Sequence, residues 1–198
     1  MIKKLINPFH YIAGFKSLIL GVIIILSTSI IGYLSNTHFP DVISIKTSPH
    51  FPAYYFIIQG LLNWIIASAI FYMASLLFSK SSVRIIDIFG TQALARAPYL
   101  LASFVGFSDS INAFGKYLLW TLMHQGEPVE ISSINIMIAI LFMFFTLLLT
   151  IWMITLMLNA LKVSANLKGS RLAIIFIVGL IISMVISVYL NTTLIKYF

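Results

Sequence analysis

The chain has 198 residues, of which 61% are apolar and 9% are charged, whereas roughly a quarter of the residues in a soluble domain are charged. Its mean hydropathy is +1.06, so this composition cannot supply a water-exposed surface. The formal charge is +7, but the basic residues are spread over short loops, which argues against nucleic-acid binding. Cysteine is absent, which excludes disulfides, thiolate metal sites and cysteine nucleophiles.

Long apolar runs predict the fold, because crossing a hydrocarbon layer of roughly 30 Å takes about 20 helical residues. We predict an all-α polytopic transmembrane bundle of about five helices, forming a single domain over residues 1–198. The first run has a longer apolar core than the roughly 7 to 15 residues of a cleaved signal peptide, so we expect it to be retained. The five predicted spans cover residues 17–36, 53–79, 85–107, 134–161 and 172–195.

The third predicted span is interrupted. It contains Asp87 near one end, Arg96 in the middle, and also Gly90 and Pro98. Either this segment crosses the membrane with Arg96 facing other helices, or it enters and returns as a re-entrant segment buried against protein.

A helix lying in the membrane interface is predicted between the third and fourth spans. Residues 108–133 are more polar than the spans, yet apolar side chains recur there at helical spacing, at Ile111, Phe114, Leu118 and Leu122. This pattern is typical of an amphipathic helix at the level of the lipid headgroups.

The basic residues predict the orientation, since short loops rich in Lys and Arg stay in the cytoplasm. With five crossings, eight of them fall on the side of the amino terminus: Lys3, Lys4, Lys16, Lys80, Arg84, Lys162, Lys168 and Arg171. The other side receives three: Lys46, Lys116 and Lys196. A re-entrant third segment would change this division to seven and four, so we predict five spans with a cytoplasmic amino end.

Four polar residues inside the spans are candidate functional residues. Arg96 comes first, because an ionised side chain at membrane depth costs at least ~2.5 kcal/mol unless it finds a partner or water. It could bind a ligand, or it could snorkel to an interface or bond carbonyls freed by Pro98. Asp87 lies nine residues earlier, on nearly the opposite face of one helix, so we expect no pair with Arg96. Gln59 and Asn63 share a helix face and are expected to bond across a helix interface.

The sequence contains no catalytic or cofactor-binding motif. A nucleophile elbow, G-x-S-x-G, and the phosphate-binding loops G-x-x-x-x-G-K-[ST] and G-x-G-x-x-G are all missing. Histidines and acids expected on the outer side lack any metal-binding spacing. These residues are His38, His50, His124, Asp41, Glu127 and Glu130. We therefore expect no metal site, no cofactor and no enzymatic activity.

Three segments resemble the Yip family of integral membrane proteins. They are Asn7-Pro8-Phe9, RIIDIFGTQALARAPYLLASFVGF around the third span, and LMLNALKVSANLKGSRLAIIFIVGLI through the last two spans. The resemblance covers nearly the whole chain and implies a bundle of five helices with a cytoplasmic amino end. Eukaryotic members engage Rab-type GTPases through an extended cytoplasmic region, but only about sixteen residues precede the first span here. The chain is therefore more similar to the short prokaryotic members, and the resemblance implies no catalytic residues.

We expect a multi-pass protein of a bacterial cytoplasmic membrane that works through contacts with lipids, with other membrane proteins or with itself. The alternative is a small transporter or permease subunit, because interrupted helices commonly build substrate sites. These two hypotheses differ in whether Arg96 faces a water-filled cavity. A membrane-embedded hydrolase or transferase would instead need polar side chains that converge in one pocket.

Overall fold

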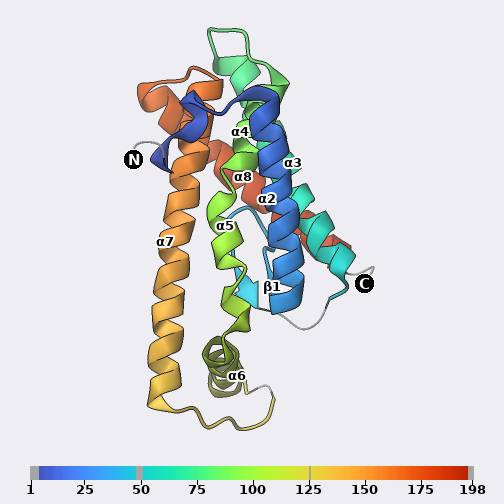
Figure 1. Cartoon of the computed structure of the whole chain (residues 1–198), viewed down its shortest axis with the longest axis vertical. Helices are drawn as coiled ribbons and strands as arrows, with labels where there is room; N and C mark the ends of the chain where they lie inside the picture. Colours follow the sequence, from blue (N-terminus) through green and yellow to red (C-terminus); the bar gives the residue numbers. More distant parts are fainter. Residues whose placement is uncertain (1–4, 48–50, 125, 196–198) are drawn as a thin grey trace.

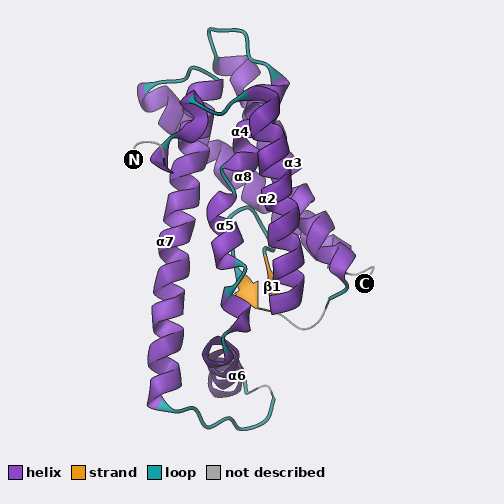
Figure 2. Cartoon of the chain, in the orientation of Figure 1, coloured by secondary structure: helices purple, strands orange, loops and turns teal. Residues whose placement is uncertain are grey.

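A computed structural model describes residues 5–47, 51–124 and 126–195 and shows an all-α bundle (Figures 1 and 2). Four helices within these ranges are long and apolar enough to cross a membrane. They are α2 (Gly14–Ser35), α3 (Ala53–Phe78), α7 (Ser133–Ser164) and α8 (Gly169–Ile195). The chain is therefore a multi-pass membrane protein.

A broken helix replaces the third predicted span. It consists of α4 (Ile85–Leu94), α5 (Ala97–Ala102) and the 3-10 helix η2 (Val105–Phe107). Pro98 stands in the first turn of α5, where it lacks an N–H to donate and its ring crowds the carbonyl four residues earlier, which accounts for the interruption.

The broken helix follows α2 along its whole length. A Cβ atom on Gly90 would lie 2.5 Å from Ser17 Oγ near the start of α2, and one on Gly106 would lie 2.0 Å from the carbonyl oxygen of Ser35 at its end. Figure 1 shows the same course, with α4, α5 and the following turn running beside α2 from one end to the other. The segment thus crosses the bundle and does not return to the side on which it began.

The helix α6 (Asp109–Met123) lies across the bundle axis. It is seen end-on in Figure 1, whereas α7 runs along the long axis of the molecule. The two helices meet where the Ser110 hydroxyl donates to Asn135 Oδ1 at 3.1 Å. This is the orientation expected of the predicted interfacial helix.

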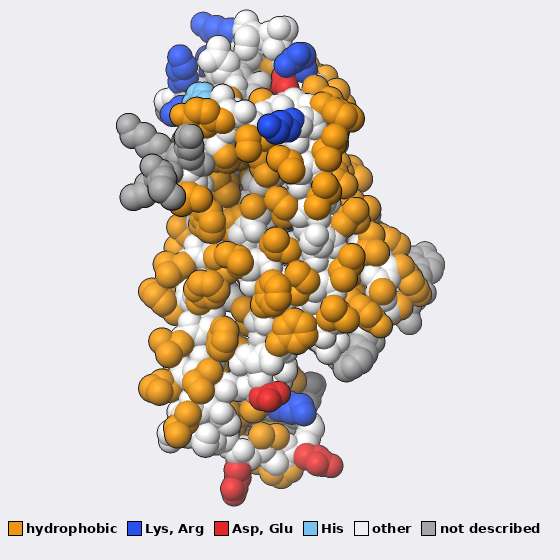
Figure 3. Space-filling view, in the orientation of Figure 1, with side chains coloured by type: hydrophobic (Ala, Val, Ile, Leu, Met, Phe, Trp, Pro, Cys, Tyr) orange, Lys and Arg blue, Asp and Glu red, His pale blue; other side chains and the backbone are white. Residues whose placement is uncertain are grey.

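Basic side chains predominate at the end of the bundle where α2 begins, and acidic side chains predominate at the other end (Figure 3). Two hydrogen bonds join the helix ends at the basic end. The Ser79 hydroxyl donates to the carbonyl of Ala165 at 2.8 Å, and Ser164 donates to the carbonyl of Asp87 at 3.2 Å. The charges of the described residues therefore separate as the five-span topology requires. Lys3, Lys4, Lys196 and His50 lie outside the described residues.

Candidate functional site

The connection between α2 and α3 enters the bundle. Two short strands, β1 (Thr37–His38) and β2 (Lys46–Thr47), pair antiparallel, and residues 39–45 between them form an inner loop. Its side chains Phe39, Asp41 and Val42 are 7%, 5% and 0% exposed. Figure 1 shows this loop reaching the height of α5. The sequence gives no sign of this, because the segment is polar and lies between two long apolar runs, as an exposed connection ordinarily does.

Side chains of α3 hold the inner loop by its backbone. Gln59 Oε1 accepts the N–H of Phe39 at 2.9 Å, and Asn63 Nδ2 donates to the carbonyls of Phe39 and Asp41 at 2.6 and 3.0 Å. Inside a hydrocarbon layer each unpaired backbone group costs several kcal/mol. Gln59 and Asn63 therefore make an irregular backbone tolerable at this depth, instead of only joining two helices.

Asn191 on α8 completes this set of hydrogen bonds. Its Nδ2 donates to the carbonyl of Pro40 at 3.0 Å and to Asn63 Oδ1 at 2.8 Å, and the residue is only 2% exposed. In the sequence Asn191 falls near the end of the last predicted span, where water or headgroups ordinarily satisfy a polar side chain. The inner loop instead brings a backbone carbonyl to it.

Tyr99 on α5 fixes the other side of the inner loop. Its ring stacks on Phe39 with centroids 4.9 Å apart, and its hydroxyl donates to the carbonyl of Ile43. Nothing in the sequence singles out Tyr99, since an aromatic residue in an apolar run is ordinarily a packing residue.

Arg96 lies at the break between α4 and α5 and is only 6% exposed, so it does not snorkel. Its Nη2 is buried and has no hydrogen-bond partner among the described residues. Together with Thr28 it lines a cavity of about 20 Å³ between α2, α3 and α5. The Thr28 hydroxyl is likewise buried without a partner there. A cavity needs ~10–15 Å³ to hold one water molecule, so this one has room for a single water.

Asp41 supplies negative charge near Arg96 but makes no direct ion pair with it in the part of the chain that the structure describes. Its Oδ1 accepts the N–H groups of Ile43 and Ser44 at 2.8 and 2.9 Å. The carboxylate thus shapes the turn at the tip of the inner loop. Asp41 thus acts on Arg96 through space and not by contact.

Asp87 belongs to the basic end and not to this centre. It stands in the first turn of α4 and pairs with Arg84 at 2.8 Å, whose side chain is 74% exposed. Of the four candidates from the sequence, Arg96, Gln59 and Asn63 converge around the inner loop, whereas Asp87 does not. Within the described residues, the ion partner of Asp87 is Arg84.

His38 enters the buried region at the base of the inner loop and is 6% exposed. Burial, followed by the nearby charge of Lys46, lowers the pKa of His38 from 6.5 to about 4. The imidazole is therefore neutral at pH 7. No group of three or more His, Asp or Glu residues that could hold a metal ion occurs within the described ranges.

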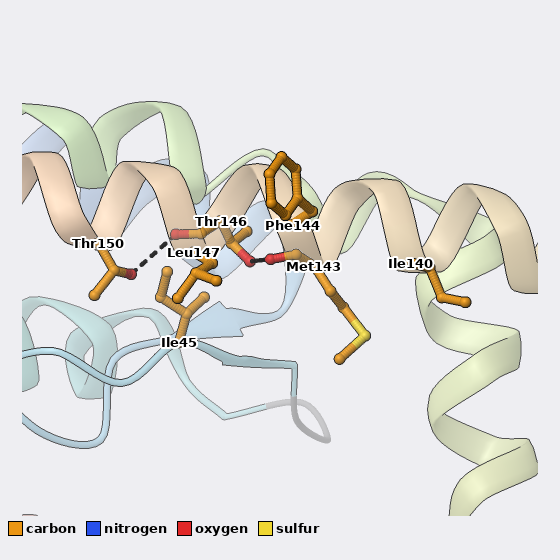
Figure 4. Close-up of a pocket in the computed structure, with 7 residues that line it drawn as sticks. All are labelled: Ile45, Ile140, Met143, Phe144, Thr146, Leu147 and Thr150. Carbon is orange, nitrogen blue, oxygen red and sulfur yellow. Dashed lines mark hydrogen bonds between the residues drawn. The ribbon is translucent and has the colours of Figure 1, made fainter.

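Beside the inner loop, α7 carries an open groove of about 600 Å³ (Figure 4). Ile45 forms one wall, and the other is formed by α7 residues that include Phe144, Thr146, Leu147 and Thr150. The hydroxyls of Thr146 and Thr150 bond the carbonyls of Met143 and Thr146 at 2.8 and 2.9 Å. The groove thus presents a mainly apolar surface.

Comparison with known proteins found no match among protein-family models, curated proteins or solved structures.

Proposed function

We propose that this chain is a non-enzymatic membrane protein of the Yip type, which works in a bacterial cytoplasmic membrane through helix contacts with other membrane proteins and with lipids. The exposure of α7 carries this proposal. In its most apolar stretch only 11% of the residues are buried, compared with 33% in α2, α3 and α8. The three segments that resemble the Yip family and the crossing third element support the same assignment.

The amino-terminal half of α7 is exposed on more than one face. Met143, Phe144 and Phe145 are 51%, 59% and 44% exposed, and successive residues of a helix point about 100° apart. A helix of a self-sufficient bundle normally turns one apolar stripe toward its own core. This half of α7 therefore offers a surface to a helix from outside the chain.

The groove on α7 also has the composition of a helix contact. Thr146 and Thr150 are four residues apart and both line it, which places two small side chains on one face. Small residues at this spacing let the backbones of two membrane helices approach closely. We infer that the groove accepts a transmembrane helix of a partner, either a second copy or another protein.

Cysteine crosslinking tests the α7 contact, because the natural chain has no cysteine. Leu147→Cys places a thiol in the groove, and Ile181→Cys on α8, with the native residue 55% exposed, is the matched lipid-facing control. We expect crosslinked products from Leu147→Cys only, and we expect Thr146→Ile with Thr150→Ile to weaken them. Equal yields from both cysteine positions would overturn the proposal, and the product mass separates a homodimer from another complex.

A second candidate function is a small transporter or permease subunit. The break at Arg96 and the unpartnered Nη2 favour it, although the cavity of about 20 Å³ would have to widen for a solute to pass. Under this hypothesis liposomes containing the protein conduct ions, and Arg96→Leu abolishes the flux. Wild-type liposomes that show no flux above empty ones would count against it.

A further inference from the structure

A second groove runs between α3 and α8 on the outside of the bundle. Its volume is about 760 Å³, which lies within the roughly 300–1,000 Å³ of pockets that bury small ligands. The walls are apolar side chains from both helices, including Met73, Leu77, Ile174, Val178 and Ile182. The groove is long and apolar, which suits a hydrocarbon chain.

Small residues line part of this groove and let α3 and α8 approach each other closely. Ala74 and Gly179 both line it, and a Cβ atom on Gly179 would lie 2.8 Å from the ring of Phe71. Beneath them Phe71 stacks on Phe176 with centroids 5.5 Å apart. The two rings are buried between α3 and α8, so the helices that form the groove are held by close packing.

One end of the groove is basic. Arg171 lines it, is exposed and stands in the first turn of α8 together with Ser170. Lys80 and Lys168 lie two residues beyond the lining residues Phe78 and Ser170. Among the described residues that line the groove, none is Asp or Glu. The unpaired N–H groups of the first helical turn add partial positive charge at the same place.

We propose that this groove binds one anionic phospholipid, with an acyl chain between α3 and α8 and the headgroup phosphate against Arg171 and the first turn of α8. Charge complementarity selects the class of lipid. The apolar walls would accept the chain of any phospholipid, whereas a cluster of Arg and Lys at the membrane surface favours an anionic headgroup. This site goes beyond the α7 contact and shares no lining residue with it, so each proposal can fail without the other.

Native mass spectrometry of the purified full-length chain, titrated with phosphatidylglycerol or phosphatidylcholine, tests the site. We expect the wild type to bind phosphatidylglycerol more tightly than phosphatidylcholine. Arg171→Gln should weaken the binding of phosphatidylglycerol about fivefold, because it removes one basic residue from beside an anionic headgroup. Lys162→Gln is the matched control, since Lys162 is also exposed at the basic end but lies on α7 outside the groove. It should retain wild-type binding.

A variant that fills the groove separates a built site from general surface charge. Ala74→Phe should weaken binding of both lipids while leaving the charge unchanged. Val178→Trp, on the exposed face of α8, serves the same purpose if Ala74→Phe reduces helicity by circular dichroism. Equal losses in Arg171→Gln and Lys162→Gln, an absence of preference in the wild type, or full binding by the filled variants would each overturn the proposal.

Discussion

Replacing Asn63 by Leu should release the inner loop and destabilise the bundle. The substitution removes three hydrogen bonds, which join Asn63 to the carbonyls of Phe39 and Asp41 and to Asn191. Interhelical polar bonds in membranes average about 0.6 kcal/mol and reach about 1.7 kcal/mol. All three bonds are buried, so we expect the free energy of unfolding to fall by about 2 to 4 kcal/mol, the upper part reflecting acceptors left without donors.

The assay is equilibrium unfolding in mixed micelles with increasing SDS, followed by near-ultraviolet circular dichroism. Asn159→Leu is the matched control, because Asn159 makes one exposed hydrogen bond of 3.0 Å, to the carbonyl of Ile6. It should cost less than about 1 kcal/mol. A thiol at Ser44→Cys should also react faster in the Asn63→Leu background. If Asn63→Leu costs no more than Asn159→Leu and the thiol stays protected, the inner loop is not held as described.

Three further predictions concern packing, pH and topology. Gly90→Ala should lower the free energy of unfolding by about 1 to 3 kcal/mol in the same assay, because a Cβ there meets the backbone of α2. Gly115→Ala is the control and should be neutral or stabilising, since the space around Gly115 is open. Equal effects of the two substitutions would contradict the tight α2–α4 contact. Because the pKa of His38 is lower in the folded protein, the unfolded chain takes up a proton at this residue at a higher pH than the folded protein does. The free energy of unfolding should therefore fall by up to about 3 kcal/mol as the pH is lowered from 6.5 to 4. His38→Phe should flatten this pH dependence, and an unchanged slope would show that His38 is not its source. Single cysteines at Lys168 and Glu127 should label from opposite sides of the membrane, with Lys168 in the cytoplasm; labelling from one side would refute the five-span topology.

The sequence alone predicted the helical elements, because their signals are local. Uninterrupted apolar runs mark α2, α3, α7 and α8, since each run must be solvated by lipid whatever it packs against. The sequence also predicted the interruption of the third element, because Pro98 disrupts helical hydrogen bonding at its own position. The apolar spacing from Ile111 to Leu122 likewise indicated α6 before its position was known.

The centre of the bundle was decided by tertiary structure. Asn63 and Asn191 are 128 residues apart, and Asn191 is 151 residues from Pro40, so neither partner can be inferred from neighbouring residues. Asp41 and His38 resemble solvated loop residues in the sequence because nothing nearby shows that the loop turns inward. The position of Arg96 was clear from the sequence, whereas its enclosure beside Thr28 depended on the packing of three helices.

The exposed surface of α7 has a related explanation. The apolar composition of α7 indicates that this helix enters the membrane. However, lipid tails are as apolar as the side chains of a neighbouring helix. Composition therefore cannot distinguish a helix covered by its own bundle from one facing outward. That distinction arises only when the other helices take their places and leave one half of α7 uncovered.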